Sequence, residues 1–214
     1  MDFVSGIVDF ILHIDKHLVE ITTEYHNLTY LILFLIVFCE TGLVVTPFLP
    51  GDSLLFAAGS IAALDSSPLN VFLLALIFFL AAFSGDNSNF FIGKFIGHKV
   101  YEKNYKLIKK EYLNRTHSFY EKHGGKTVIM ARFIPIVRTF APFVAGVGGM
   151  QYLRFILFSM TASLLWIGVF VTAGYKFGQM EIVKNNFSLV TLAIIFVSVL
   201  PIIIGFIRSR MQKA

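Results

Sequence analysis

The sequence predicts an all-α integral membrane protein, with about four transmembrane helices and two facing re-entrant helical hairpins arranged as an inverted repeat. Composition is the first observation behind this prediction. Hydrophobic residues make up 56% of the 214 residues and charged residues only 14%, which is more apolar surface than one soluble core could bury. The second observation is a pair of apolar segments, 47–64 and 127–150, that are each interrupted by proline and glycine. Such corresponding breaks are typical of transporters with discontinuous helices.

The N-terminal segment, residues 1–27, is expected to form an interfacial amphipathic helix. Its apolar residues recur at helical spacing from Phe3 to Ile21, with charged residues between them. A helix packed against the transmembrane bundle would show the same pattern, so both interpretations stay open.

Four apolar runs are long enough to cross the hydrocarbon layer, which takes about 20 residues. Three belong to a membrane core expected over residues 28–178, and the fourth is a C-terminal transmembrane helix that precedes a basic tail, residues 208–214. The predicted spans are 28–46, 69–97, 152–177 and 187–207.

The two interrupted segments are predicted to enter the membrane without crossing it. Pro50 and Gly51 are the expected break in the first, and Pro135, Pro142 and Gly146 are the expected breaks in the second. Split there, each arm is a helix of two or three turns, roughly 10 to 15 Å long. Backbone groups freed at that depth must be surrounded by protein or line a water-filled cavity.

Charge asymmetry gives the orientation of this multi-pass chain. Residues 98–126 contain eight Lys or Arg against three Glu, and the tail is also basic. The positive-inside rule therefore places this loop and both termini in the cytoplasm, with the hairpins opening to opposite sides. The net charge of +5 comes from these loops, so we expect contact with anionic headgroups and no nucleic-acid partner.

Four ionisable residues fall inside the predicted membrane region: Glu40, Asp52, Arg132 and Arg138. Unpaired, each would cost roughly 2.5 to 3.5 kcal/mol at the bilayer centre, so they must pair or line an aqueous cavity. Arginine forks bind phosphate through two hydrogen bonds, which predicts an anion site. A structural ion-pair cluster that holds the hairpins together is the alternative.

Other polar residues are weaker candidates. Ser53 and Thr139 lie beside the charges and could donate hydrogen bonds to a phosphate. Asp86 and Asn87 lie within the second span, where hydrogen bonding between helices is favoured over substrate contact. No motif with metal-ligand spacing is present, and no nucleophile with a general base is visible, so neither a metal, a cofactor nor an enzyme is predicted.

At these residues the chain resembles the DedA family of bacterial inner-membrane proteins, within the SNARE-associated Golgi protein (VTT domain) superfamily. The motifs that carry the resemblance are the Phe48-Leu-Pro-Gly-Asp run with the upstream Glu40, the Gly85-Asp86 pair with Phe91-Ile-Gly-Lys-Phe-Ile-Gly97, and Arg132-Phe-Ile-Pro-Ile-Val-Arg138-Thr with Pro142 and Ala145-Gly146. Ile136-Val137 departs from the family pattern, where many members have glycine after the proline.

The resemblance implies facing re-entrant hairpins and, for several members, recycling of undecaprenyl phosphate that depends on the proton motive force. Eukaryotic relatives are lipid scramblases. The family residues implicated in activity are an acidic pair and two arginines, which map here to Glu40, Asp52, Arg132 and Arg138.

We therefore expect a flippase of the bacterial cytoplasmic membrane that moves undecaprenyl phosphate or a related anionic lipid. In this hypothesis Arg132 and Arg138 bind the phosphate, while Glu40 and Asp52 take up protons. The alternatives are an energy-independent phospholipid scramblase, an intramembrane lipid-phosphate enzyme and a structural membrane-homeostasis protein. The expected partners are the anionic lipid, protons and the bilayer, and a homo-oligomer stays open.

Overall fold

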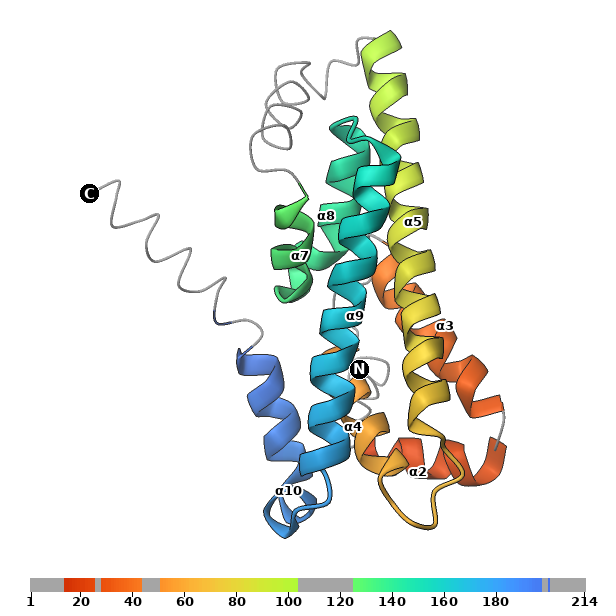
Figure 1. Cartoon of the computed structure of the whole chain (residues 1–214), viewed down its shortest axis with the longest axis vertical. Coiled ribbons are helices and arrows are strands. Elements are labelled where there is room, and N and C mark those ends of the chain that lie inside the picture. Colours follow the sequence, from red (N-terminus) through yellow and green to blue (C-terminus); the bar gives the residue numbers. More distant parts are fainter. Residues whose placement is uncertain (1–13, 26–27, 44–50, 104–124, 198–199, 201–214) are drawn as a thin grey trace, which may run out of the picture. The chain divides into compact units, whose positions relative to one another are not determined.

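The computed structural model describes residues 14–25, 28–43, 51–103, 125–197 and 200. These residues form helices joined by turns and include no β-strand, so the all-α prediction is confirmed (Figure 1). The helices are α2 (Ile14–Tyr25), α3 (Leu28–Gly42), α4 (Gly51–Ala62), α5 (Val71–Lys103), α7 (Lys126–Arg132), α8 (Pro135–Val147), α9 (Tyr152–Phe177), α10 (Glu181–Asn185) and an unlabelled helix Phe187–Val197.

Two helices have the length and composition needed to cross a membrane, Val71–His98 within α5 and Tyr152–Phe177 as α9. Large apolar side chains on both are exposed, including Phe72 at 82% and Leu153 at 69%. Water would not favour so much apolar exposure, whereas lipid does. The other two predicted spans are described only in part, as the shorter apolar helices Leu28–Gly42 and Phe187–Val197.

Several predicted features lie wholly or partly outside the described residues. They are the break at Pro50, most of the basic loop 98–126, the basic tail 208–214, and the beginning of the N-terminal segment 1–27. These remain predictions.

The chain divides into two compact units. The first comprises Met1–Phe34, Pro50–Phe78 and Ile167–Ala214, and the second comprises Leu35–Leu49 and Phe79–Trp166. The long helices α5 and α9 each contribute residues to both units.

In the first unit, α2 packs against α4. Leu18 and Thr22 on α2 are buried, and Thr22 donates a hydrogen bond to the Leu18 carbonyl, 2.6 Å away. This packing agrees with the second interpretation of the N-terminal segment, a helix held against the bundle. Contact of the same helix with the membrane surface stays a prediction.

The first unit also brings α4 against the C-terminal half of α9 at glycine positions. A Cβ on Gly174 would collide with the Phe56 backbone, and one on Gly59 would lie 3.2 Å from the Tyr175 nitrogen and closer still to the Val171 carbonyl oxygen. Glycine is therefore required at both positions, because the two backbones touch.

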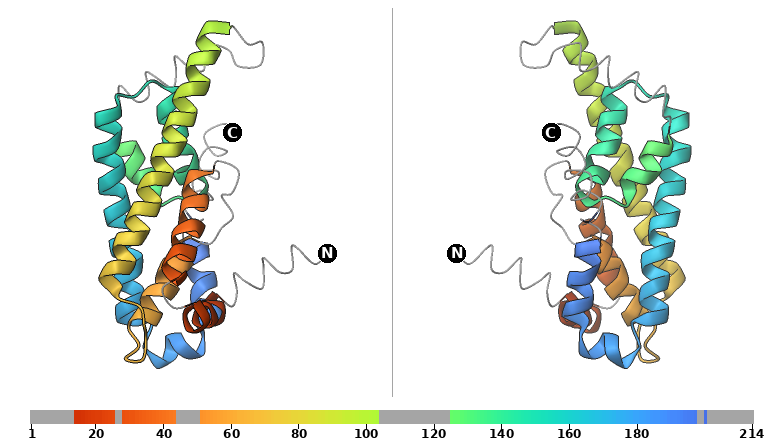
Figure 2. Two further views of the ribbon diagram at one scale, coloured as in Figure 1. Left: turned by 90° about the vertical axis from the view of Figure 1, so that its right-hand side faces the viewer. Right: turned by 90° about the vertical axis from the view of Figure 1, so that its left-hand side faces the viewer.

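The second unit repeats this crossing with α8 against α5. A Cβ on Gly93 would collide with the Phe143 carbonyl, and one on Gly146 would collide with the Phe90 carbonyl and lie 2.8 Å from the Lys94 nitrogen. Figure 2 shows α8 (teal) running beside α5 (yellow to green) in both views.

The two crossings have the same residue spacing. In each, the short helix contributes a phenylalanine followed three residues later by glycine. The facing glycines are four residues apart, Gly93 with Gly97 in α5, and Gly174 in α9 with Gly178 directly after its end. In each crossing, a short helix from one half of the sequence packs on the long helix of the other half. The two crossings therefore share one local pattern of helix contact. The inverted repeat of hairpins stays a prediction.

The break in the second interrupted segment falls at Phe133-Ile134, between α7 and α8, and the two helices pack on one another. Pro135 is the first residue of α8, a position where its missing N–H costs nothing. The predicted breaks at Pro142 and Gly146 are wrong, because both residues lie inside the continuous helix α8. The helix α8 continues through Pro142 despite the backbone hydrogen bond lost there, and Gly146 instead serves the close approach of α8 to α5.

Candidate functional site

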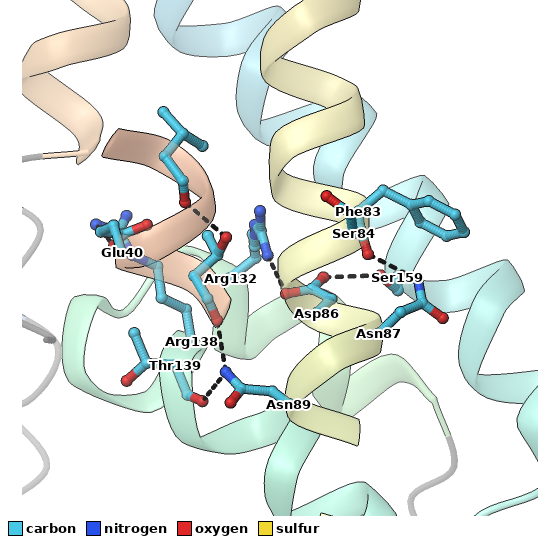
Figure 3. A network of polar contacts seen from close by, with 12 residues as sticks. Glu40, Phe83, Ser84, Asp86, Asn87, Asn89, Arg132, Arg138, Thr139 and Ser159 are labelled. Carbon is cyan, nitrogen blue, oxygen red and sulfur yellow. Dashed lines mark hydrogen bonds and ion pairs between the residues drawn. The ribbon is translucent and has the colours of Figure 1, made fainter. Parts of the chain in front are cut away.

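The second unit buries a salt bridge between α3 and α8. Arg138 Nε and Nη2 both donate to Glu40 Oε1, at 2.8 Å and 2.7 Å (Figure 3). The Glu40 side chain is 0% exposed and that of Arg138 is 2% exposed. The structure thus joins two of the charges that the sequence placed inside the membrane, although they are far apart along the chain.

A second buried salt bridge joins α7 to α5. Arg132 Nη1 donates to Asp86 Oδ1 at 2.6 Å, and Ser159 Oγ on α9 donates to the other carboxylate oxygen of Asp86 at 2.7 Å (Figure 3). The Arg132 side chain is 3% exposed, and its position in the last turn of α7 lets the helix dipole stabilise the positive charge. Asp86 therefore forms a buried salt bridge in addition to the hydrogen bonding between helices that the sequence favoured.

Trp166 on α9 lies against both arginines. The guanidinium carbons of Arg132 and Arg138 are 4.7 Å and 5.1 Å from the centre of its ring, and Trp166 is fully buried. Cation–π attraction at this distance is worth up to about 2 kcal/mol when the cation is desolvated. The indole ring therefore brings the two like charges to one place and offsets part of their desolvation.

Glycine and asparagine residues of α5 set the geometry around the first salt bridge. A Cβ on Gly85 would collide with the Thr41 side chain and lie 2.9 Å from the Gly42 nitrogen, so this glycine lets α3 approach α5. Asn89 Nδ2 donates to the Thr41 carbonyl at 2.5 Å and to the Thr139 carbonyl at 3.2 Å. Because Thr41 follows Glu40 and Thr139 follows Arg138, Asn89 ties together the backbones that carry the pair.

Asn87 faces a different group from the charges. It accepts a hydrogen bond from the Tyr152 hydroxyl at 2.9 Å, and Tyr152 lies beside Phe90 and Phe91 in an aromatic cluster. Its amide nitrogen donates to the Phe83 carbonyl within α5. Asn87 thus helps to fix α9 on α5, which is the interhelical hydrogen bonding that the sequence favoured.

The remaining predicted residues, Asp52 and Ser53, begin α4 in the first unit. Both are buried, and Asp52 lies in the first turn, where the helix dipole favours a negative charge. Their predicted roles in proton uptake and phosphate contact stay predictions.

Neither Trp166 nor Ser159 was among the predicted site residues. The sequence spacing does show that Ser159 and Trp166 lie on one face of α9, because they are seven residues apart. Trp166 is the chain's only tryptophan, but nothing local in the sequence shows that two arginines meet it.

The site combines two carboxylates and two guanidinium groups, which are formally neutral together. No group of three or more His, Cys, Asp or Glu that could hold a metal ion occurs within the described part of the chain. Buried arginine donors suit an oxyanion, and here they contact Asp86 and Trp166 on the two long apolar helices α5 and α9. The fold and the site together define a helical membrane protein with buried acid–arginine pairs.

Comparisons with known proteins agree with this class. Residues 49–176 match the VTT domain. The chain is 52% identical to Protein DedA of Escherichia coli (strain K12), over all of this chain and 98% of that protein. It is 42% identical to an uncharacterised membrane protein of Mycobacterium tuberculosis, over 82% of this chain and 78% of that protein. It is 34% identical to the inner membrane protein YqjA of Escherichia coli (strain K12), over 72% and 69%.

No solved structure matches the chain. The chain belongs to the DedA family of VTT-domain membrane proteins. The matched domain includes Asp86, Arg132 and Arg138, whereas Glu40 lies before it.

Proposed function

We propose that this protein is a flippase that moves undecaprenyl phosphate, or a related anionic lipid, across the bacterial cytoplasmic membrane with proton coupling. The environment of Arg132 is the observation that supports this proposal most. Its guanidinium is buried, and its Nε and Nη2 have no hydrogen-bond acceptor among the described residues. A phosphate headgroup offers the paired oxygens that such donors bind, while the lipid tails stay in the bilayer.

The proposal includes a topology with both termini in the cytoplasm and two facing re-entrant hairpins in an inverted repeat. The matching glycine crossings of α4 and α8 support two equivalent hairpin units. Because Arg132 and Arg138 are almost fully buried, a headgroup reaches them only when the packing around α7 and α8 opens. Rocking of the hairpins about Pro50-Gly51 and Pro135 would provide this opening.

Proton coupling would act through the carboxylates Glu40 and Asp52. Glu40 neutralises Arg138 in the structure, so a proton on Glu40 would release that arginine toward an anion. The lipid is cargo in this proposal and leaves chemically unchanged. Release of inorganic phosphate from lipid by the purified protein would instead indicate an intramembrane enzyme.

The test is reconstitution in liposomes that contain a fluorescent undecaprenyl-phosphate analogue, with and without an imposed pH gradient. We expect gradient-dependent movement by the wild type and its loss in Arg138→Ala. Arg154→Ala is the matched control, because Arg154 is an exposed arginine on the same unit and should leave the movement unchanged.

The other outcomes separate the alternatives. Movement that ignores the gradient would identify an energy-independent scramblase. No movement of this lipid or of other anionic phospholipids would contradict transport and favour a structural role in membrane homeostasis.

A further inference from the structure

The two buried arginines present their donors in different ways. Arg138 uses Nε and Nη2, the two donors along one edge of the guanidinium, on Glu40. Arg132 uses a different guanidinium nitrogen, because only its Nη1 donates to Asp86. Its Nε and Nη2 have no hydrogen-bond acceptor among the residues that the structure describes, although the side chain is 3% exposed.

The Nε and Nη2 atoms of Arg132 form a fork that fits two oxygens of one oxyanion. These two N–H groups are parallel, and they match the oxygen spacing of phosphate or carboxylate. Buried polar groups nearly always have a hydrogen-bond partner, so a buried fork without one points to a ligand. Lysine could not replace it, because an ammonium group is a point charge without this fork.

Asp86 holds this fork in place. Arg132 bonds to one of its oxygens and Ser159 to the other, so the carboxylate cannot turn freely. Trp166 lies against the guanidinium, 4.7 Å from its central carbon. The groups that hold Arg132 therefore leave its Nε and Nη2 edge buried without an acceptor.

We propose that the Nε–Nη2 edge of Arg132 is the direct contact for a phosphate monoester headgroup, and that Asp86 is a positioning residue that also limits how tightly the anion binds. This inference rests on the proposed function and gives the two arginines different roles. In the state that the structure shows, Arg132 binds the phosphate, while Glu40 holds Arg138 and Arg138 supplies positive charge nearby. Asp86 limits affinity because its negative charge offsets that of Arg132.

The charge balance predicts opposite effects for two variants. Arg132→Lys keeps the charge but loses the fork, so phosphate should bind about tenfold or more weakly. Asp86→Asn keeps an oxygen for Arg132 but removes a negative charge near the anion, so phosphate should bind about tenfold or more tightly. Arg138→Lys should change binding by less than about threefold, because the fork of Arg138 is used on Glu40. A purely structural Asp86 would give no gain in affinity.

The test is isothermal titration of the purified full chain in detergent with farnesyl phosphate, followed in parallel by the emission of Trp166. The chain has one tryptophan, so the emission reports on this site alone. Farnesol controls for binding of the isoprenoid tail. Arg154→Lys is the matched control, because Arg154 is exposed on α9, and its affinity should equal that of the wild type.

Inorganic phosphate separates the two sources of the same chemistry. Tighter binding of farnesyl phosphate than of inorganic phosphate supports a lipid headgroup, and equal binding would overturn the lipid assignment. Wild-type affinity in Arg132→Lys, an unchanged or weaker affinity in Asp86→Asn, or no binding of farnesyl phosphate by the wild type would each overturn the inference. If Arg132→Lys does not fold, the gain of affinity in Asp86→Asn remains decisive.

The binding and transport measurements can contradict the two proposals independently. Farnesyl phosphate binding with the expected variant pattern, but no lipid movement in liposomes, would contradict the proposed flippase and leave the binding fork intact. Lipid movement with unaltered binding in Arg132→Lys would contradict the fork and leave the flippase intact.

Discussion

The salt bridge between Glu40 and Arg138 offers the sharpest test of the buried site. Glu40→Gln removes the negative charge and leaves the Arg138 guanidinium, now 2% exposed, without its counter-ion. Breaking a buried pair from one side costs about 3 to 5 kcal/mol. At about 2 to 4 °C per kcal/mol for a chain of this size, the melting temperature should fall by about 6 to 20 °C.

The assay is thermal unfolding in detergent followed by far-ultraviolet circular dichroism, arranged as a double-mutant cycle. Arg138→Gln alone should cost as much as Glu40→Gln alone. The double variant should cost less than the two single variants together, because neither charge then remains buried and alone. Glu24→Gln, at an exposed position on α2, is the matched control and should lie within about 0.5 kcal/mol of the wild type.

A loss below about 1 kcal/mol in Glu40→Gln would refute this reasoning, since that is the value typical of an exposed pair. Strict additivity in the double variant would also refute it, because two side chains that share hydrogen bonds must be coupled.

Two further predictions concern packing and hydrogen bonding. Gly146→Ala should destabilise the protein, because the new methyl group would meet the Phe90 carbonyl, whereas Gly168→Ala has open space and should be neutral or stabilising by up to about 1 kcal/mol; their melting temperatures decide this. Ser159→Ala should cost about 1 to 3 kcal/mol, because it leaves a buried Asp86 oxygen without its donor, while Thr161→Ala, at an exposed hydroxyl on α9, should cost less in the same unfolding measurement. Equal effects within either pair would contradict the packing or the hydrogen bond.

Local chemistry allowed part of the fold to be predicted. The apolar composition and run lengths gave an all-helical membrane chain, and both long helices lie where the runs predicted. Pro135 gave the break before α8, because proline cannot donate to a preceding helical turn. The same rule wrongly predicted a break at Pro142, because tertiary packing can keep a helix continuous through a proline.

Part of the site was also visible in the sequence. The signs and positions of Glu40, Arg132 and Arg138 required pairing, because isolated charges are costly in lipid. The choice of partner was not visible, and Arg132 pairs with Asp86 in the structure. A salt bridge depends on where helices cross, and that crossing depends on contacts between residues far apart in sequence.

The sequence by itself determined the class of this protein, its helical segments and the charges that must be satisfied within them. These properties follow from apolar area, periodicity and proline geometry, which act over a few residues. Only the tertiary structure decided that Gly85 lets α3 approach α5, that Trp166 lies against both arginines, and that one arginine has a buried donor edge without an acceptor. Those outcomes arise because close packing fixes side chains from five helices at distances of a few ångströms, and no local pattern in the chain contains that information.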